Sequence, residues 1–324
     1  MSEPLVLLAL LAAATVREAA PLVLAALGGL FAERSGVVDV GLEGKMLAAA
    51  FAAAATAAVT GSAWLGLGAG VAAAIALAMV HGLACVTYHG NQVVSGMALN
   101  ILMSGLTVVL GYAWFQQGGQ TPLLDGAARF GPIALPGAAV LAGVRVVGLL
   151  YGEVVSGHNV IVYMAAAAVP VVAWLVYRTR FGLRLRAVGD SPGAVDTAGI
   201  SVAATRYRAL AVGGALCGLS GSYLSIAHHS GFIRDMSAGK GYLSLAALIF
   251  GQWRPVPTLA ACLLFAFADV VQIRLQGTPL PVVGVVPVQL IQAIPYLLTV
   301  GLLAGFVGRA VAPRAIGVPY VKER

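Results

Sequence analysis

Long apolar runs recur along the chain, separated by short polar or glycine-rich stretches. A helix needs about 20 apolar residues to cross the hydrocarbon core of a bilayer. The opening run, residues 5–31, is long enough but contains Arg17, Glu18 and Pro21, so it predicts either one kinked helix or a short segment followed by a second. Eight further runs predict spans, at residues 43–60, 64–88, 92–115, 158–177, 207–228, 237–253, 256–273 and 286–308.

This pattern predicts an all-α integral membrane protein. We expect a polytopic bundle of about nine transmembrane helices, within bounds of about eight to ten, in one domain of residues 1–324. Residues 133–151 are apolar but rich in Gly and Pro, which favours a short hairpin or an interfacial segment.

Composition excludes an ordinary water-soluble domain. The 324 residues are 60% hydrophobic and 10% charged, with a mean hydropathy of +0.93. Soluble domains carry about 25% charged residues, so lipid is the solvent that suits this chain.

The formal net charge of +7 is distributed as in a membrane protein. Basic residues beside spans mark the cytoplasmic side. We therefore expect a multi-pass protein of the cell membrane with a cytoplasmic C-terminus, and no nucleic-acid binding because base-stacking aromatics do not interleave with the charges. The basic residues form two groups: Arg178, Arg180, Arg184, Arg186, Arg206 and Arg208 in one stretch, and Arg309, Arg314, Lys322 and Arg324 at the C-terminus.

Two segments 195 residues apart are similar. Ser35–Lys45 aligns with Ser230–Lys240, and alternate crossing of the membrane places the two on opposite sides. This indicates an inverted repeat, with halves at 1–157 and 209–310 and a substrate path between them; coincidence in an Ala- and Gly-rich sequence is the alternative. The identical pairs are Ser35/Ser230, Gly36/Gly231, Gly44/Gly239, Lys45/Lys240 and Ala52/Ala247.

The cytoplasmic loop, residues 178–208, contains signals for a short helix. Ser191 suits the N-cap, Pro192 the first helical position and Gly199 the left-handed position after the helix. A helix of about two turns is not stable alone. Docking on a partner protein would explain it; a plain connector is the alternative.

The same loop carries a family resemblance. The segments FGLRLRAVGD (181–190), AGI (198–200) and GGALCGLSG (213–221) resemble permeases of the branched-chain amino acid, ribose and nucleoside group of ABC importers. The resemblance implies that the loop couples to a separate ATPase. The coupling residues would be Arg186, Gly189, Asp190, Ser191, Pro192, Ala194 and Gly199.

A second match, Ala26–Gly44, resembles the subgroup served by basic-membrane-protein-type lipoproteins that bind nucleosides. The segments 233–241 and 246–253 also fit this subgroup. Two departures stand out, because Asp39 occupies a position where Asn is usual and Lys45 one where an apolar residue is usual. The signature implies gating residues at Glu33, Arg34, Ser35, Gly36, Asp39, Glu43 and Gly44.

Motifs for ATP or metal chemistry are missing from the sequence. It contains no GxxxxGK[ST] phosphate loop, and no His or Cys residues at metal-ligand spacing. We therefore expect no enzyme activity, metal or cofactor in this chain, with ATP and Mg²⁺ on the partner ATPase.

Polar residues inside spans are expensive to bury, so they line a path or bond neighbouring helices. Either role suits each of these residues. The candidates for the substrate path are Asn91, Gln92, Ser95, Asn100, Asp269, Gln272, Gln289 and Gln292.

The resemblance thus implies an importer that works by alternating access with an ATPase, an extracytoplasmic substrate-binding lipoprotein and a second, related permease subunit. Nucleosides are the expected substrate, with simple sugars, riboflavin-like ligands or amino acids as alternatives. A gradient-driven secondary transporter is disfavoured because Asp269, Arg17 and Glu18 are almost the only ionisable residues within spans. A scaffolding protein is the third possibility.

Overall fold

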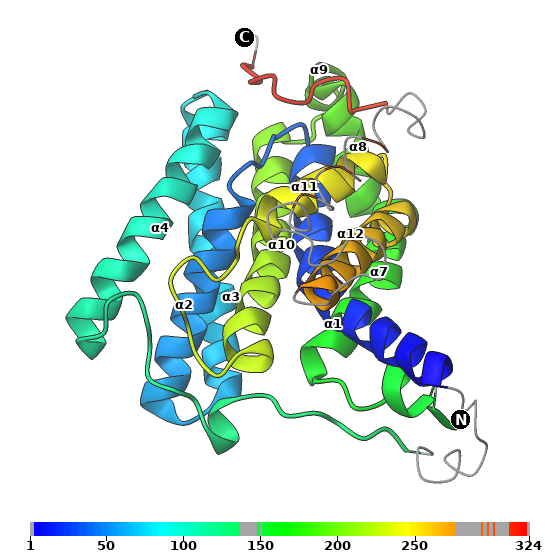
Figure 1. Cartoon of the computed structure of the whole chain (residues 1–324). Coiled ribbons are helices and arrows are strands. Elements are labelled where there is room, and N and C mark those ends of the chain that lie inside the picture. Colours follow the sequence, from blue (N-terminus) through cyan, green and yellow to red (C-terminus); the bar gives the residue numbers. More distant parts are fainter. Residues whose placement is uncertain are drawn as a thin grey trace.

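The computed structural model describes residues 3–136, 148–149, 151–276, 293, 297, 301 and 311–322. Every regular element in these residues is a helix (Figure 1). Seven helical segments there are long and apolar enough to cross a membrane. They are α1 (Glu3–Arg34), α2 (Leu42–Thr60), α3 (Ala63–Gly82) continued by η1 (Leu83–Thr87), α4 (Gln92–Phe115), α7 (Val160–Arg178), α10 (Val202–Tyr223) continued by η4 (Leu224–His228), and α12 (Pro255–Leu275).

Five shorter elements complete the described fold: η2 (Gly126–Ala128), η3 (Tyr151–Val155), α8 (Arg180–Asp190), α9 (Pro192–Thr197) and α11 (Lys240–Phe250). The expected span at 286–308 lies outside the described residues, as does most of the hairpin expected at 133–151.

The opening run forms one continuous helix, which settles the choice that the sequence left open. Pro21 has no N–H to donate, so the carbonyl of Arg17, four residues earlier, loses its helical partner. The Tyr223 hydroxyl donates to that carbonyl at 2.9 Å, and Ser220 Oγ donates to the Pro21 carbonyl at 2.7 Å. Side chains of the neighbouring helix α10 therefore donate hydrogen bonds to the backbone carbonyls at and before the proline.

The prediction of a full span at 237–253 is wrong. The helix there, α11, has 11 residues, which at 1.5 Å per residue is about 16 Å. The hydrocarbon core is about 30 Å thick, so α11 reaches only part of the way across. The residues before it cannot extend the helix, because Asp235, Ala238 and Gly239 all have positive φ.

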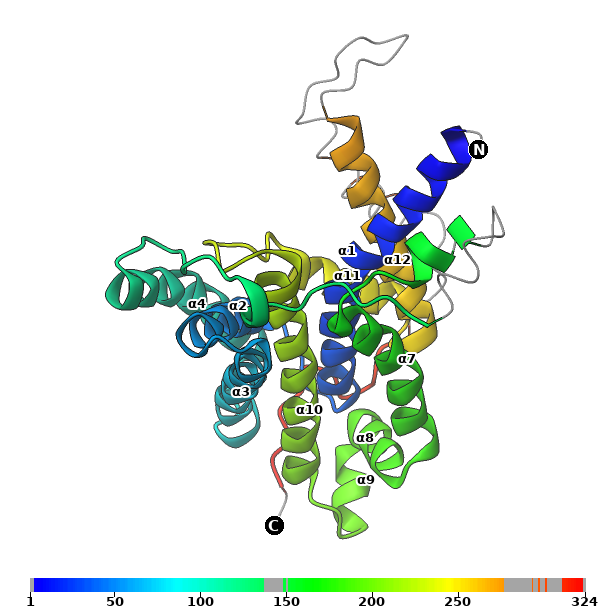
Figure 2. The ribbon, with the colours of Figure 1, turned by 90° about the horizontal axis from the view of Figure 1, so that it is seen from below.

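Helix α10 lies between α1 on one side and α2 and α3 on the other (Figure 2). Glycines permit this close packing: a Cβ atom on Gly213 would lie 2.6 Å from the Gly28 carbonyl oxygen, and one on Gly214 would lie 2.9 Å from Ala78 Cβ. Small residues at helix contacts are typical of membrane bundles, where packing replaces the hydrophobic effect. The core is correspondingly rich in alanine along α2.

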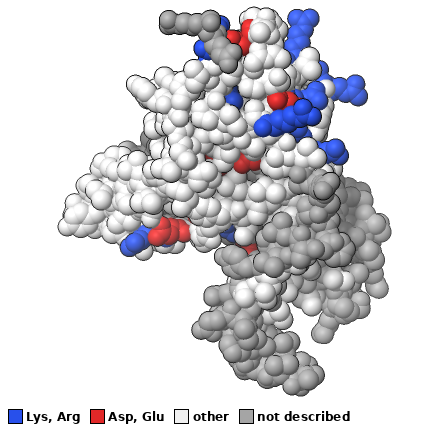
Figure 3. Space-filling view, turned by 90° about the horizontal axis from the view of Figure 1, so that it is seen from above, with Lys and Arg blue, Asp and Glu red and all other residues white. Residues whose placement is uncertain are grey.

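The short helices α8 and α9 and the C-terminal residues lie at the same end of the molecule (Figure 1). Seen from that end, basic side chains gather over one part of the surface (Figure 3). Arg178, Arg180, Arg184 and Arg208 are exposed. Arg206 is 1% exposed and donates to the carbonyls of Ser35 and Val318, so one of the six arginines of the loop is structural.

Candidate functional site at the half-helix

The half-helix α11 is held at its N-terminal end by one carboxylate from the start of α2. Glu43 accepts hydrogen bonds from Ser237 Oγ at 2.5 Å, the Gly239 N–H at 2.9 Å and the Gly241 N–H at 2.7 Å. Free N–H groups and a partial positive charge at a helix N-terminus favour such an anion. A Cβ atom on Gly241 would lie 2.5 Å from the Glu43 backbone nitrogen, so this approach requires glycine.

The other end of α11 is held from the end of α1. Trp253 Nε1 donates to Glu33 at 2.5 Å, and Arg34 donates through Nε and Nη2 to the Trp253 carbonyl at 3.0 and 2.8 Å. Gln252 and Trp253 both adopt φ of +53°, a conformation uncommon for residues with a side chain. We call Glu33, Arg34 and Glu43 the bracket, because together they fix both ends of α11.

The bracket joins the two similar segments found in the sequence. Glu43 belongs to the first segment, and Gly239 lies in the second. Of the expected gating residues, Ser35 and Gly36 lie in the turn after α1, where Gly36 has φ of +87°. The division into repeat halves at 1–157 and 209–310 stays a prediction.

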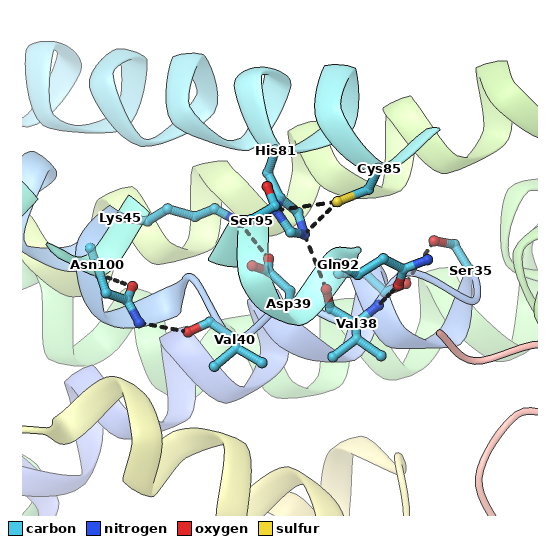
Figure 4. A network of polar contacts seen from close by, with 12 residues as sticks. Ser35, Val38, Asp39, Val40, Lys45, His81, Cys85, Gln92, Ser95 and Asn100 are labelled. Atoms are coloured by element: carbon cyan, nitrogen blue, oxygen red, sulfur yellow. Dashed lines mark hydrogen bonds and ion pairs between the residues drawn. The ribbon is translucent and has the colours of Figure 1, made fainter. Parts of the chain in front are cut away.

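Asp39 and Lys45, the two residues that the resemblance marks as unusual, form a single ion pair (Figure 4). Lys45 Nζ lies 2.5 Å from Asp39 Oδ2, and both side chains are buried. Burial alone would raise the pKa of the Asp39 carboxyl, but Lys45 and His81 outweigh it and hold the pKa below its ordinary value. Each residue therefore compensates the charge of the other.

Three of the four polar candidates around α4 bond neighbouring segments. Gln92 Oε1 accepts from the Val38 N–H at 2.6 Å. Asn100 Oδ1 accepts from the Gly44 N–H at 2.8 Å, while its Nδ2 donates to the Val40 carbonyl at 3.0 Å and to the Tyr242 hydroxyl at 2.8 Å.

Figure 4 shows these amides around the loop between α1 and α2. Ser95 lies 3.0 Å from His81 Nδ1, and His81 Nε2 donates to the Val38 carbonyl. Asn91 caps α4 by accepting from Val93 and Val94. The geometry of this group thus supports helix-to-loop bonding and capping over contact with a substrate.

A charged cluster of residues far apart along the chain lies near the start of α11. Lys240 Nζ lies 2.9 Å from Glu18 Oε2, and His228 Nε2 lies 3.3 Å from Glu18 Oε1. Asp269 on α12 lies within electrostatic reach of Lys240 and Glu18 and is half-buried. Gln272 is half-buried on the same helix, and Gln289 and Gln292 lie outside the described residues.

In the sequence, Glu18 interrupts the first apolar run and Lys240 belongs to the second of the two similar segments. Their 222-residue separation along the chain hides the contact. The signal available beforehand was that both are ionisable residues at or beside an apolar run.

The short helix expected within residues 178–208 forms as α9. Pro192 occupies its first turn and Gly199 has φ of +77°, while Ser191 stands at the N-cap position without a side-chain hydrogen bond. Arg186 lies over the Tyr177 ring at 5.4 Å, and Asp190 is exposed. An open groove of about 680 Å³ between α8 and α9 is lined by residues that include Leu183, Ala187 and Ala194.

The C-terminal segment, Val311–Lys322, lies across this region. The Ala315 N–H donates to the Gly189 carbonyl at 2.8 Å, and the Gly317 N–H donates to the Gly36 carbonyl at 3.1 Å. Lys322 lies 3.4 Å from Asp196. The segment therefore contacts α8, α9 and the turn after α1 at once.

Comparison with known proteins identifies the class. A family model described as the permease component of a branched-chain amino acid transport system matches residues 11–303. Since this covers most of the chain, the protein belongs to that family of transport permeases, and it is a multi-pass membrane protein.

Relatives that are about equally similar to this chain are named for different substrates. The chain is 36% identical to the guanosine ABC transporter permease NupQ of Bacillus subtilis, over 98% of each chain. It is 37% identical to the putative glucose ABC transporter permease TsgC13 of Haloferax volcanii, over 94% of each. It is 34% identical to the nucleoside ABC transporter permease NupC of Lactococcus lactis, over 94% of each. NupB, a second nucleoside permease of that Lactococcus strain, is 31% identical over 109 residues, which is 33% of this chain and 30% of NupB.

Proposed function

We propose that this chain is the membrane-spanning subunit of an ATP-driven importer of nucleosides. The bracket is the observation that carries this proposal. It fixes a helix that is too short to cross the membrane, and discontinuous helices of this kind form substrate sites in transporters. The names of NupQ and NupC support nucleosides as the substrate.

Coupling to ATP would pass through α8 and α9. These helices present an apolar groove and exposed arginines at one end of the bundle (Figure 3). By the distribution of basic residues this end is cytoplasmic, and so is the C-terminal segment beside it. ATP and Mg²⁺ belong to the separate ATPase subunit in this proposal.

Two further partners complete the proposed transporter. An extracytoplasmic binding lipoprotein would deliver the substrate, and a second, related permease would form the other half of the path. The match to part of NupB, from the strain that also carries NupC, supports a pair of different permeases.

Reconstitution tests this proposal. The chain, its ATPase, the second permease and the receptor are placed in proteoliposomes, and uptake of labelled guanosine is measured with ATP and with a non-hydrolysable analogue. We expect uptake only with ATP. Uptake driven by an ion gradient without the ATPase would overturn the proposal.

Sugars are the second candidate substrate, because the relative named as a putative glucose permease is as similar as the nucleoside permeases. A ligand screen on the isolated receptor separates the two. Binding of glucose but of no nucleoside would transfer the proposal to sugars.

A further inference from the structure

The charged cluster beside α11 unites side chains from three elements. Glu18 comes from α1, His228 from η4 and Lys240 from the first residue of α11. Glu18 lies between the two others, 2.9 Å from Lys240 and 3.3 Å from His228. Since Glu43 already accepts the hydrogen bonds of the α11 N-terminus, the Glu18–Lys240 pair is not needed to cap that helix.

The three side chains retain access to a surface. Glu18 is 16% exposed, Lys240 19% and His228 31%. A charged group that faces hydrocarbon is strongly unfavourable, so charges within spans face a water-filled space or another polar surface. His228 also lines a cavity of about 420 Å³ with His229 and Arg129, which gives the cluster an aqueous neighbour.

The cluster is close to neutral as a whole. Glu18 and Asp269 are acidic, and Lys240 and Arg17 are the cations within electrostatic reach. The sequence from 275 to 308 contains no Asp, Glu, Lys or Arg, so that part of the chain adds no charge here. A balanced cluster favours a neutral ligand over an ion.

The acceptor and donor sites that Glu18 and Lys240 leave unused toward the described residues are suited to hydroxyl groups. A carboxylate has about four acceptor sites and an ammonium about three donors. Among the described residues, Glu18 uses two of its acceptor sites and Lys240 one of its donors. Acceptors and donors therefore remain side by side, and a pair of adjacent hydroxyls offers the complementary arrangement. We propose that Glu18 and Lys240, with His228, form a contact site for the vicinal hydroxyls of a neutral substrate in transit. The proposal rests on the proposed function, since it places the ribose diol of a nucleoside on this pair.

Thiol labelling tests the proposal in the permease–ATPase complex without its receptor. Cys85, Cys217 and Cys262 are buried and are replaced by alanine, and His228→Cys is introduced as the only thiol of this chain. A membrane-impermeant methanethiosulfonate reagent is then applied with millimolar guanosine or 2′,3′-dideoxyguanosine, which lacks both ribose hydroxyls. We expect guanosine to slow labelling at least fivefold and the dideoxy analogue to have no effect. Equal protection by both, or by neither, would overturn the proposal.

A charge exchange separates substrate contact from simple stabilisation. Glu18→Gln should lower guanosine uptake by the complete transporter at least tenfold, while the amount of assembled permease–ATPase complex stays the same. The double variant Glu18→Lys with Lys240→Glu retains an ion pair but reverses the positions of donors and acceptors, and we expect it to stay inactive. Full recovery in this variant would show that the pair only stabilises the fold. Asp235→Asn, which alters an exposed carboxylate paired with exposed Arg234, is the matched control.

The experiments distinguish a failure of the proposed function from a failure of the proposed contact site. A wild-type transporter that takes up no guanosine overturns both, whereas normal uptake without diol-dependent protection overturns the contact site alone.

Discussion

Lys45 Nζ and Asp39 Oδ2 lie 2.5 Å apart, with both side chains buried between the first helices of the bundle. Each residue supplies the charge that the other requires. Removal of one partner of a buried pair leaves an isolated charge and costs about 3–5 kcal/mol, whereas replacement of both is often neutral.

We therefore predict that Asp39→Asn and Lys45→Met each destabilise the purified permease by about 3–5 kcal/mol, and that the double variant recovers most of the loss. Unfolding of the detergent-solubilised protein measures the three values as a double-mutant cycle. Additive losses would contradict a direct ion pair.

Glu43 has a role that a neutral side chain cannot fill. Its two oxygens accept three hydrogen bonds, and Glu43→Gln turns one oxygen into an NH₂ group that faces an N–H. An unsatisfied buried donor costs about 1–3 kcal/mol, so α11 should lose its fixed position. We predict that ATP-driven uptake falls at least tenfold while ATPase activity continues.

The control for Glu43→Gln is Glu153→Gln, which changes an acidic residue outside the candidate spans. Unchanged uptake in Glu43→Gln would show that α11 keeps its place without this carboxylate.

Two glycines, one in α8 and one in α9, offer a matched pair of variants. A Cβ atom on Gly189 would overlap the Arg34 carbonyl oxygen, whereas one on Gly193 would have no heavy atom within 4 Å. Overpacking costs about 1–3 kcal/mol. We predict that Gly189→Ala lowers the thermal stability of the permease and that Gly193→Ala does not. Equal stability of the two variants would show that α8 can move away from α1 at no cost.

The C-terminal segment should hold α8 and α9 against the turn after α1. Deletion of residues 311–324 removes the partner of the Gly189 carbonyl, the partner of the Gly36 carbonyl and one acceptor of Arg206. We predict that trypsin cleaves this variant faster after Arg180 and Arg184 in α8. Gel electrophoresis and mass spectrometry of the fragments measure the cleavage rate. Deletion of residues 323–324 alone is the control, and equal cleavage rates would contradict the prediction.

The polar candidates illustrate where sequence reasoning stops. Asn100 was equally suited to a substrate path and to interhelical bonding, because an amide has the same donors and acceptors in either role. The contacts to Gly44, Val40 and Tyr242 favour the second role. Those partners lie 56, 60 and 142 residues away, so no local pattern predicts them.

The length of α11 illustrates the same limit. The apolar run at 237–253 satisfied the composition of a span, but hydropathy does not report backbone conformation. Positive φ at Ala238 and Gly239 starts the helix late, and the turn at Gln252 and Trp253 ends it early. The bracket that fixes both ends comes from α1 and α2, far away along the chain.

The sequence by itself determined the membrane, the helical class, the family and the position of the short helix α9, because each follows from local composition or from a contiguous motif. Helix propensity, apolar length and the conformational demands of Pro192 and Gly199 act within a few residues. Only the tertiary structure decided which charges are paired and which helix is too short to cross the membrane. Those outcomes depend on side chains that meet across hundreds of residues, as Glu18 meets Lys240, and on the high cost of an unpaired charge in lipid.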